Sequence, residues 1–208
     1  MSKRNLIILG STFGVVVIGL AIWLTVRALS VTVYDTTPVD DQPLVYLGDE
    51  DAETEILLAL DYSCPWCKVW MEEVLPELEE EYITTGEATF RIQAMTFLDN
   101  ASLRLANFDQ NIIRHAPEQY FAVARRIIQD SQSEDDDGYW GTDAYISDLV
   151  AEFALDSELM LQEPELDSMN VSRRYQRGLN VETVPSVYVN GVKVNEPFDI
   201  DEIHNLIR

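Results

Sequence analysis

Residues 56–67 read ILLALDYSCPWC, in which a continuous apolar run leads directly into two cysteines separated by two residues. An uninterrupted apolar run of this length is typical of a strand that is buried on both faces of a sheet. From Pro65 onward the apolar residues recur at helical spacing and stop before Gly86. The cysteines therefore stand where a buried strand passes into a helix, and Pro76 is expected to kink that helix.

The position of the two cysteines at this junction indicates their chemistry. Because Cys64 precedes the helix and Pro65 opens it, the Cys64 sulfur faces unpaired backbone N–H groups and the positive end of the helix dipole. Both favour the thiolate, so we expect the pKa of Cys64 to fall from about 8.5 to between roughly 3.5 and 7. Cys67 lies one turn further along and can resolve a mixed disulfide formed at Cys64. Between them, Trp66 is expected to be exposed, as part of the active-site dipeptide Pro65-Trp66.

A structural disulfide and a zinc site are the alternative uses of such a pair. A bridge that closes a four-residue loop gives only about 2 kcal/mol, against about 4.7 kcal/mol for a loop of a hundred residues. A zinc site needs further ligands, and the sequence holds no second cysteine pair, while His115 and His204 lie far from the motif. We therefore expect redox chemistry that uses neither a metal nor a cofactor.

The rest of the chain alternates strands and helices, which indicates an α/β protein. The patterns predict the following elements in chain order: a short strand over 44–47, a strand over 90–94, a mainly helical block over about 98–163 that includes a helix capped by Thr142, a helix over 168–177 that Gly178 ends, a hairpin over 186–194 turned by Asn190-Gly191, and a helix over 199–207.

The N-terminal region carries an uncharged apolar stretch over residues 5–26. About 20 apolar residues in a helix span the roughly 30 Å of a bilayer's hydrocarbon core. Lys3 and Arg4 precede it, so the positive-inside rule places residues 1–4 in the cytoplasm and the rest of the chain outside. We expect a single-pass protein of the cell membrane with a linker over 27–41 and an extracytoplasmic domain over 42–208.

A cleaved signal peptide is the competing interpretation of this segment. Ala28-Leu29-Ser30 offers a small-x-small cleavage pattern, although the apolar core is longer than the usual 7–15 residues of a signal peptide. Both interpretations export the domain, so the chemistry expected of the cysteines is the same in either case.

Composition excludes several classes of protein. The formal net charge is -23, from 37 acidic and 14 basic residues, and such a field repels a nucleic-acid backbone. Both cysteines of the chain fall in the one motif, which excludes a small scaffold stapled by several disulfides. Nothing in the sequence resembles a dimerisation domain, so we expect a monomer.

Two motifs resemble the DsbA-like branch of the thioredoxin superfamily, namely DYSCPWCK at residues 61–68 and GLNVETVPSVYVNG at residues 178–191. The resemblance runs from about Gln42 to the end of the chain. It implies a thioredoxin fold with a helical insertion, preceded here by the transmembrane helix. It also implies that Pro185 is cis and packs against the active-site cysteines. Val184 and Pro185 would then form the client groove, where backbone groups of Val184 pair with an extended peptide.

The sequence departs from this family at one position. Relatives commonly carry a buried acid six residues before the first cysteine, where it relays a proton to the second cysteine, and here that position is Leu58. Asp61 is the candidate for this relay, and we expect it to lie nearer the surface than the usual acid. Water is the alternative relay.

The resemblance implies a dithiol oxidase that introduces disulfides into newly exported proteins through Cys64 and Cys67. Such an enzyme is left reduced after each cycle and needs a DsbB-like membrane quinone reductase as its partner. Two alternatives stay open: an extracytoplasmic reductase or isomerase, and a peptide-binding module of the same fold that does no catalysis.

Overall fold

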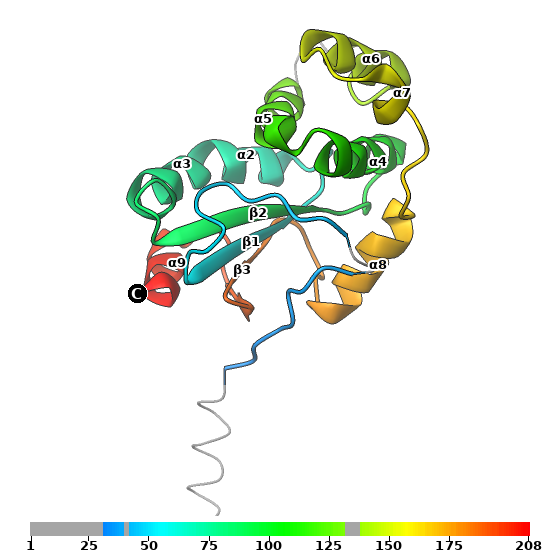
Figure 1. The fold of residues 1–208 in the computed structure, drawn as a ribbon. Helices are drawn as coiled ribbons and strands as arrows, with labels where there is room; N and C mark the ends of the chain where they lie inside the picture. The colour runs from blue at the N-terminus through cyan, green and yellow to red at the C-terminus, as the bar shows by residue number, and fades with distance from the viewer. Residues whose placement is uncertain (1–30, 40–41, 132–137) are drawn as a thin grey trace, which may run out of the picture. The chain divides into compact units, whose positions relative to one another are not determined.

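The computed structural model describes residues 31–39, 42–131 and 138–208 (Figure 1). The predicted transmembrane segment over 5–26 lies outside these residues. Within the described part of the chain, no helix is long and apolar enough to cross a membrane. The cysteine motif belongs to a unit that begins at Val33 and continues to the C-terminus.

A four-stranded sheet in the order β2-β1-β3-β4 forms the centre of this unit. Its strands are β1 (Thr54–Leu60), β2 (Ala88–Ala94), β3 (Ser186–Val189) and β4 (Val192–Lys193). β1 pairs parallel to β2 and antiparallel to β3, and β3 pairs antiparallel to β4. β1 is central and buried on both faces, which is why its sequence is a continuous apolar run rather than an alternating one.

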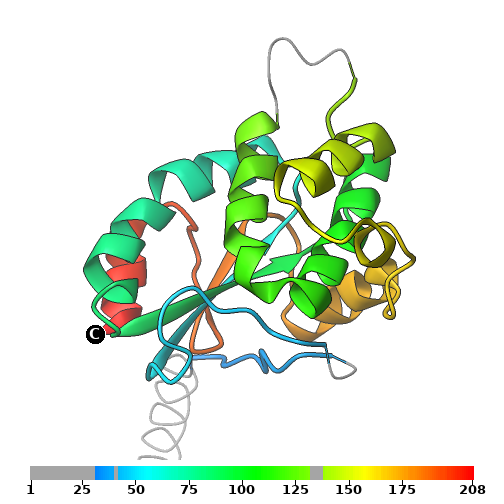
Figure 2. The same cartoon turned by 45° about the horizontal axis from the view of Figure 1, so that its top comes forward.

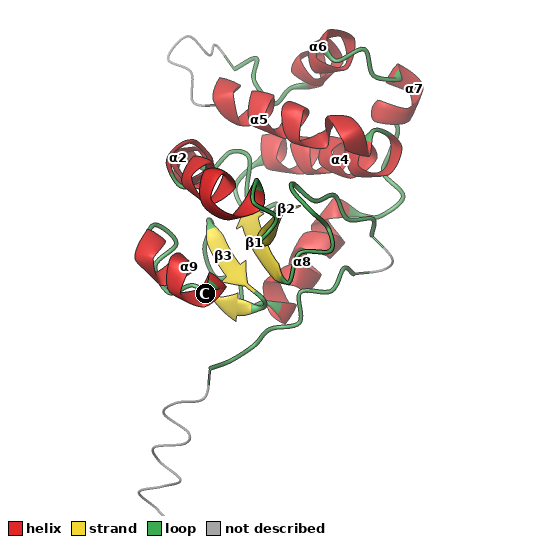
Figure 3. Cartoon of the chain, turned by 60° about the vertical axis from the view of Figure 1, so that its left-hand side comes forward, coloured by secondary structure: helices red, strands yellow, loops and turns green. Residues whose placement is uncertain are grey.

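Helices cover both faces of the sheet, as Figure 3 shows, with α2 and α9 on one side and α8 on the other. On the first side Ile56, Leu58 and Leu60 pack into the larger core, and on the second side Leu57 and Ala59 pack into a smaller one. In chain order the helices are α2 (Pro65–Glu73), α3 (Leu75–Leu78), η1 (Glu79–Ile83), α4 (Asn100–His115), η2 (Pro117–Gln119), α5 (Tyr120–Asp130), α6 (Asp143–Glu152), α7 (Ser157–Met160), α8 (Ser168–Gly178) and α9 (Ile200–Ile207).

The predicted helical block over 98–163 contains α4 to α7, which gather over α2 in Figures 1 and 2. A buried carboxylate, Asp109 on α4, joins this block to the cysteine loop. It accepts hydrogen bonds from the hydroxyls of Tyr62 (2.6 Å) and Tyr120 (2.9 Å). Burial raises the pKa of Asp109 to about 6, although the two hydroxyl donors act in the opposite direction.

Lys68, one residue after the second cysteine, makes a second connection to the helical block. Its Nζ donates to the carbonyl oxygens of Gln129 (2.9 Å) and Ser131 (2.7 Å), where α5 ends. A lysine at this point complements the negative end of the α5 dipole. The insertion is therefore fastened to the first turn of the helix that begins at the cysteines.

The predicted kink is confirmed, because the helix that starts at Pro65 is interrupted at Val74, two residues before Pro76. Pro76 has no N–H to donate to the preceding turn, so the α-helical ladder breaks there. Beyond α3 the chain continues in the wider π form of η1. The Thr142 cap is also confirmed, since its hydroxyl accepts from the Tyr145 N–H at 3.2 Å.

The prediction of a short strand before the central one was wrong. The segment over 44–47 is no strand but a single bridge between Leu47 and Phe90, because Pro43 offers no N–H before it and Gly48 turns the chain with a φ of 97° after it. The helix predicted over 168–177 is confirmed to within one residue, because α8 ends at Gly178. The left-handed residue after it is Asn180 (φ 54°).

Part of the predicted linker over 27–41, at residues 33–39, packs onto the domain. The Tyr34 N–H donates to the Gly191 carbonyl at 2.8 Å, and the Tyr34 ring lies edge-on to that of Tyr188. A Cβ on Gly191 would stand 2.3 Å from the Tyr34 carbonyl oxygen, so this approach requires glycine. Tyr34 and Val39 join the smaller core, which explains why an otherwise polar stretch is held in place.

Candidate active site

The two cysteines occupy the first turn of α2 with unequal access to solvent. Cys64 is the N-cap residue, with extended backbone angles (φ -87°, ψ 116°), and Pro65 opens the helix. Cys64 keeps 6% of its surface exposed, whereas Cys67 is fully buried. Both are free thiols. A client sulfur can therefore reach Cys64, and Cys67 can act only through Cys64.

The pKa values of the two thiols move in opposite directions. The Cys67 thiol donates to the Cys64 sulfur and lowers the pKa of Cys64 to about 6, despite the opposing effect of burial. Backbone N–H groups of Cys67 and Trp66 act in the same direction, as expected at a helix N-terminus. Burial and the neighbouring Cys64 sulfur raise the pKa of Cys67. At neutral pH the site therefore holds one thiolate and one thiol.

The loop before β3 lies against the exposed sulfur. The Val184–Pro185 peptide bond is cis, as the resemblance implied, and the Cys64 Sγ lies 3.5 Å from the Val184 carbonyl oxygen. Beside this contact runs a groove of about 590 Å³. Its lining residues include Cys64, Phe97, Leu98, Met169, Thr183 and Val184.

Exposed apolar side chains lie within the cysteine motif and in the groove beside it. Trp66 is 64% exposed, as expected, and lies edge-on to Phe198, which is 42% exposed, with ring centroids 6.1 Å apart. Leu98, in the groove, is 54% exposed. Trp70 belongs to the core, where its Nε1 donates to the Pro197 carbonyl at 2.8 Å and so holds the loop that carries Phe198. Clustered apolar exposure of this kind marks an interaction surface.

Asp61 is fully buried, so the expectation that it lies near the surface was wrong. Its carboxylate accepts from the backbone N–H groups of Ser63 (2.9 Å), Phe97 (2.8 Å) and Leu98 (3.2 Å), and from the Ser102 hydroxyl (2.6 Å). These donors satisfy a carboxylate that could not otherwise remain inside the protein.

The buried Asp61 carboxylate also influences the cysteines. Burial raises the pKa of Asp61, whereas its hydrogen-bond donors lower it. Its charge in turn raises the pKa of both Cys64 and Cys67. Leu58, at the position where relatives carry their acid, is buried in the larger core. Asp61 is thus the acidic group that this chain places next to the redox pair.

Sequence reasoning missed the residues that connect the cysteine loop to the groove. The Ser63 hydroxyl donates to Asp99 at 2.9 Å, and Asp99 caps α4 in a reciprocal capping box with Ser102. The spacing of Asp99 and Ser102 is a capping signal that the sequence does carry. Phe198 carries no such signal, because only the fold brings it to Trp66.

The two histidines lie apart from each other. His115 ends α4, and its Nε2 lies 3.2 Å from the Nε2 of Gln162 within the helical insertion. His204 lies on α9, beside Glu77 and Glu81.

Comparison with known proteins identifies the family. A family model described as thioredoxin matches residues 40–208. The chain belongs to the thioredoxin family. Disulfide bond formation protein D of Bacillus subtilis is 24% identical over 179 residues, which cover 81% of this chain and 77% of that protein. The probable disulfide bond formation protein D of Bacillus anthracis is 26% identical over 159 residues, which cover 74% of this chain and 72% of that protein.

Solved structures show the same fold. The oxidised BdbD of Bacillus subtilis matches with a TM-score of 0.65 and 22% identity, over 86% of this chain and 97% of that one. The α-DsbA1 of Wolbachia pipientis matches with a TM-score of 0.67 and 18% identity, over 83% of this chain and 92% of that one. The protein is therefore a DsbA-like thiol–disulfide oxidoreductase of the thioredoxin superfamily.

The opposite pKa shifts lead to a titration test on the reduced protein. Ultraviolet thiolate absorbance should rise through a single step with a midpoint near pH 6, because only Cys64 ionises there. A Cys64→Ala variant should lose this step, since the remaining thiol at Cys67 has a raised pKa. In a Cys67→Ala variant the step should move to higher pH, because the donor to the Cys64 sulfur is gone. An unchanged midpoint in that variant would contradict the assignment.

Proposed function

We propose that this protein is an extracytoplasmic dithiol oxidase, which donates its Cys64–Cys67 disulfide to cysteine-containing client proteins. The observation that carries the proposal is the position of Cys64 at the start of α2, where the buried Cys67 thiol and two backbone N–H groups lower the pKa of Cys64 to about 6. Stabilising the thiolate stabilises the reduced protein, and this makes the corresponding disulfide a stronger oxidant. The relatives are named disulfide bond formation proteins, which supports electron flow from the client to this protein.

The reaction proceeds in two exchanges. A client thiolate attacks the Cys64 sulfur of the disulfide, the bond between Cys64 and Cys67 breaks, and Cys67 leaves with the electron pair. The second client thiolate then attacks the client sulfur of the mixed disulfide and expels Cys64 as a thiolate. The client is oxidised and the protein is reduced by two electrons. The low pKa of Cys64 favours the second exchange, because a more acidic thiol is a better leaving group.

Cys67 needs a proton in the first exchange. Its raised pKa means that the departing sulfur does not persist as a thiolate. We infer that Asp61 relays this proton, since it is buried, its pKa is raised, and its charge raises the pKa of both cysteines. The proton ends on Cys67, and solvent restores the one that Asp61 gave.

The groove beside Cys64 is the proposed client site. An extended peptide can pair with the backbone of Val184 next to the exposed sulfur, as in β-augmentation. Leu98, Met169 and Trp66 offer apolar contacts that are independent of the client sequence. Unfolded, newly exported chains expose the apolar side chains that such a surface binds.

Each cycle leaves the protein reduced, so a second partner must reoxidise it. We propose a DsbB-like membrane quinone reductase, in line with the DsbA-like family. A transmembrane anchor over 5–26 would keep the monomeric domain on the outer side of the membrane, close to that partner and to emerging clients.

The reduction potential tests the direction of electron flow. Equilibration of the domain with glutathione buffers should give a value less negative than about −270 mV, shifted toward about −120 mV, because the reduced form holds a stabilised thiolate. A value near that of thioredoxin, about −270 mV, would contradict the oxidase and favour a reductase.

Replacing Asp61 with Asn tests the proton relay. The first exchange with a model dithiol should slow by roughly tenfold or more, since general acid catalysis of this kind contributes about 10²-fold or more. The solvent deuterium isotope effect on this step should also change, which a purely structural role would leave unaltered. Ser102→Ala is the matched control, because it removes one donor and keeps the carboxylate. Unchanged rates and isotope effects in Asp61→Asn would leave water as the relay.

Cysteine labelling tests the proposed location. The chain has only two cysteines, and Cys64 is the accessible one, so labelling reports on the domain alone. A membrane-impermeant maleimide should label Cys64 in intact, reduced cells, and the full-length chain should stay with the membranes after an alkaline wash. Labelling only after lysis would rule out an exported domain, and a chain shortened near Ser30 would show a cleaved signal peptide.

A further inference from the structure

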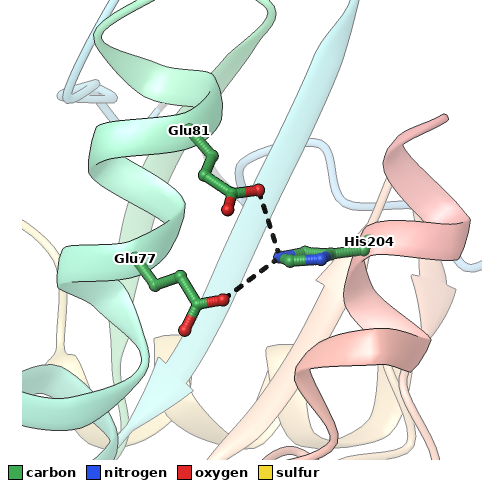
Figure 4. Close-up of side chains that lie close together, drawn as sticks. All are labelled: Glu77, Glu81 and His204. Atoms are coloured by element: carbon green, nitrogen blue, oxygen red, sulfur yellow. Dashed lines mark ion pairs between the residues drawn. The ribbon is translucent and has the colours of Figure 1, made fainter.

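Three potential metal ligands meet away from the cysteines. They lie where α3 and η1 face α9. Glu77 belongs to α3, Glu81 to η1, and His204 to α9. One ligand atom from each lies within 4.8 Å of the others. Figure 4 shows the two carboxylates and the imidazole pointing toward one another.

The ring nitrogen of His204 is the unusual member of this cluster. Its Nε2 is buried and has no hydrogen-bond partner. It lies 3.8 Å from Glu77 Oε1 and 3.7 Å from Glu81 Oε2, which is too far for a hydrogen bond to either. A buried nitrogen gains from a partner, so this atom is available as a ligand for a cation placed between the three side chains.

The distances match the space around a small cation. Zinc binds histidine nitrogen and carboxylate oxygen at about 2.0–2.2 Å, so two ligands of a tetrahedral site lie roughly 3.4 Å apart. The two separations from the His204 nitrogen, 3.8 and 3.7 Å, exceed this by a few tenths of an ångström, and the two carboxylate oxygens lie within 4.8 Å of each other. The side chains of Glu77 and Glu81 are 49% and 45% exposed, so they are free to close that difference.

The imidazole is held in position for such a role. The Tyr82 ring packs edge-on against it, with centroids 5.4 Å apart, and Ile203 next to it is fully buried. The His204 side chain itself is only 12% exposed. The packed imidazole and the two partly exposed carboxylates would let the glutamates move toward an ion held at the histidine.

We propose that Glu77, Glu81 and His204 form a Zn²⁺ site, with water as the fourth ligand. One imidazole with two carboxylates suits zinc better than calcium or magnesium, which prefer ligand sets made of oxygen alone. The ion links α9 to α3 and η1, which follow α2 beyond its interruption at Val74 and so lie away from the cysteines. Its role is to fasten the C-terminal helix, and it takes no part in the disulfide exchange.

Thermal unfolding with and without Zn²⁺ tests the site. The full chain is used in detergent micelles and in its oxidised form, so that Cys64 and Cys67 are paired and cannot bind the metal. Zn²⁺ at a hundredfold excess over the dissociation constant should raise Tm by roughly 5–10 °C, and a chelator should reverse the rise. Mg²⁺ and Ca²⁺ at the same concentration should have little effect.

Variants show whether the rise comes from these residues. Glu81→Gln and His204→Gln should lose the Zn²⁺-dependent rise, whereas Glu80→Gln, with the same change of charge on an exposed neighbour, should keep it. Glu81 is half-exposed, so its variant gives a folded protein even where His204→Gln does not. No rise in the parent chain, an equal rise with Mg²⁺, or an equal loss in Glu80→Gln would overturn the proposal.

Discussion

The negative charge on the Cys64 sulfur depends on donors that exist only because a helix begins at that residue. The Cys67 thiol and two backbone N–H groups of the first turn of α2 stabilise it. Their positions are fixed by β1, which is buried on both faces and paired on both edges, so its end cannot shift. The chemistry of one sulfur thus rests on the register of the central strand.

Asp61 extends this constraint from the cysteine loop to the groove. A single carboxylate binds the backbone of Ser63 on one side and of Phe97 and Leu98 on the other. The four hydrogen-bond donors offset the cost of burying the Asp61 charge. The same bonds hold the groove wall at Phe97 and Leu98 next to the cysteine loop. The other wall of the groove is formed at Val184, which lies 120 residues after Cys64 in the chain.

The helix that starts at Cys64 performs different tasks at its two ends. Its first turn holds the thiolate and, through Lys68, the end of α5. Beyond the break at Val74 it presents Glu77 and Glu81 to His204 on the C-terminal helix. The break separates the redox end from the end that anchors α9.

The order of strands and helices, the cysteine pair at the start of a helix and the Asn190-Gly191 hairpin follow from the sequence, because these features are encoded by neighbouring residues. The burial of Asp61, the contact of Trp66 with Phe198 and the meeting of His204 with two glutamates do not. Each of these contacts joins residues that are distant in the chain. A local sequence pattern does not show which distant residues will meet in the fold. Local chemistry therefore determined the reactive sulfur. Only tertiary packing decided what surrounds it, since burial and long-range hydrogen bonds arise when separate elements meet.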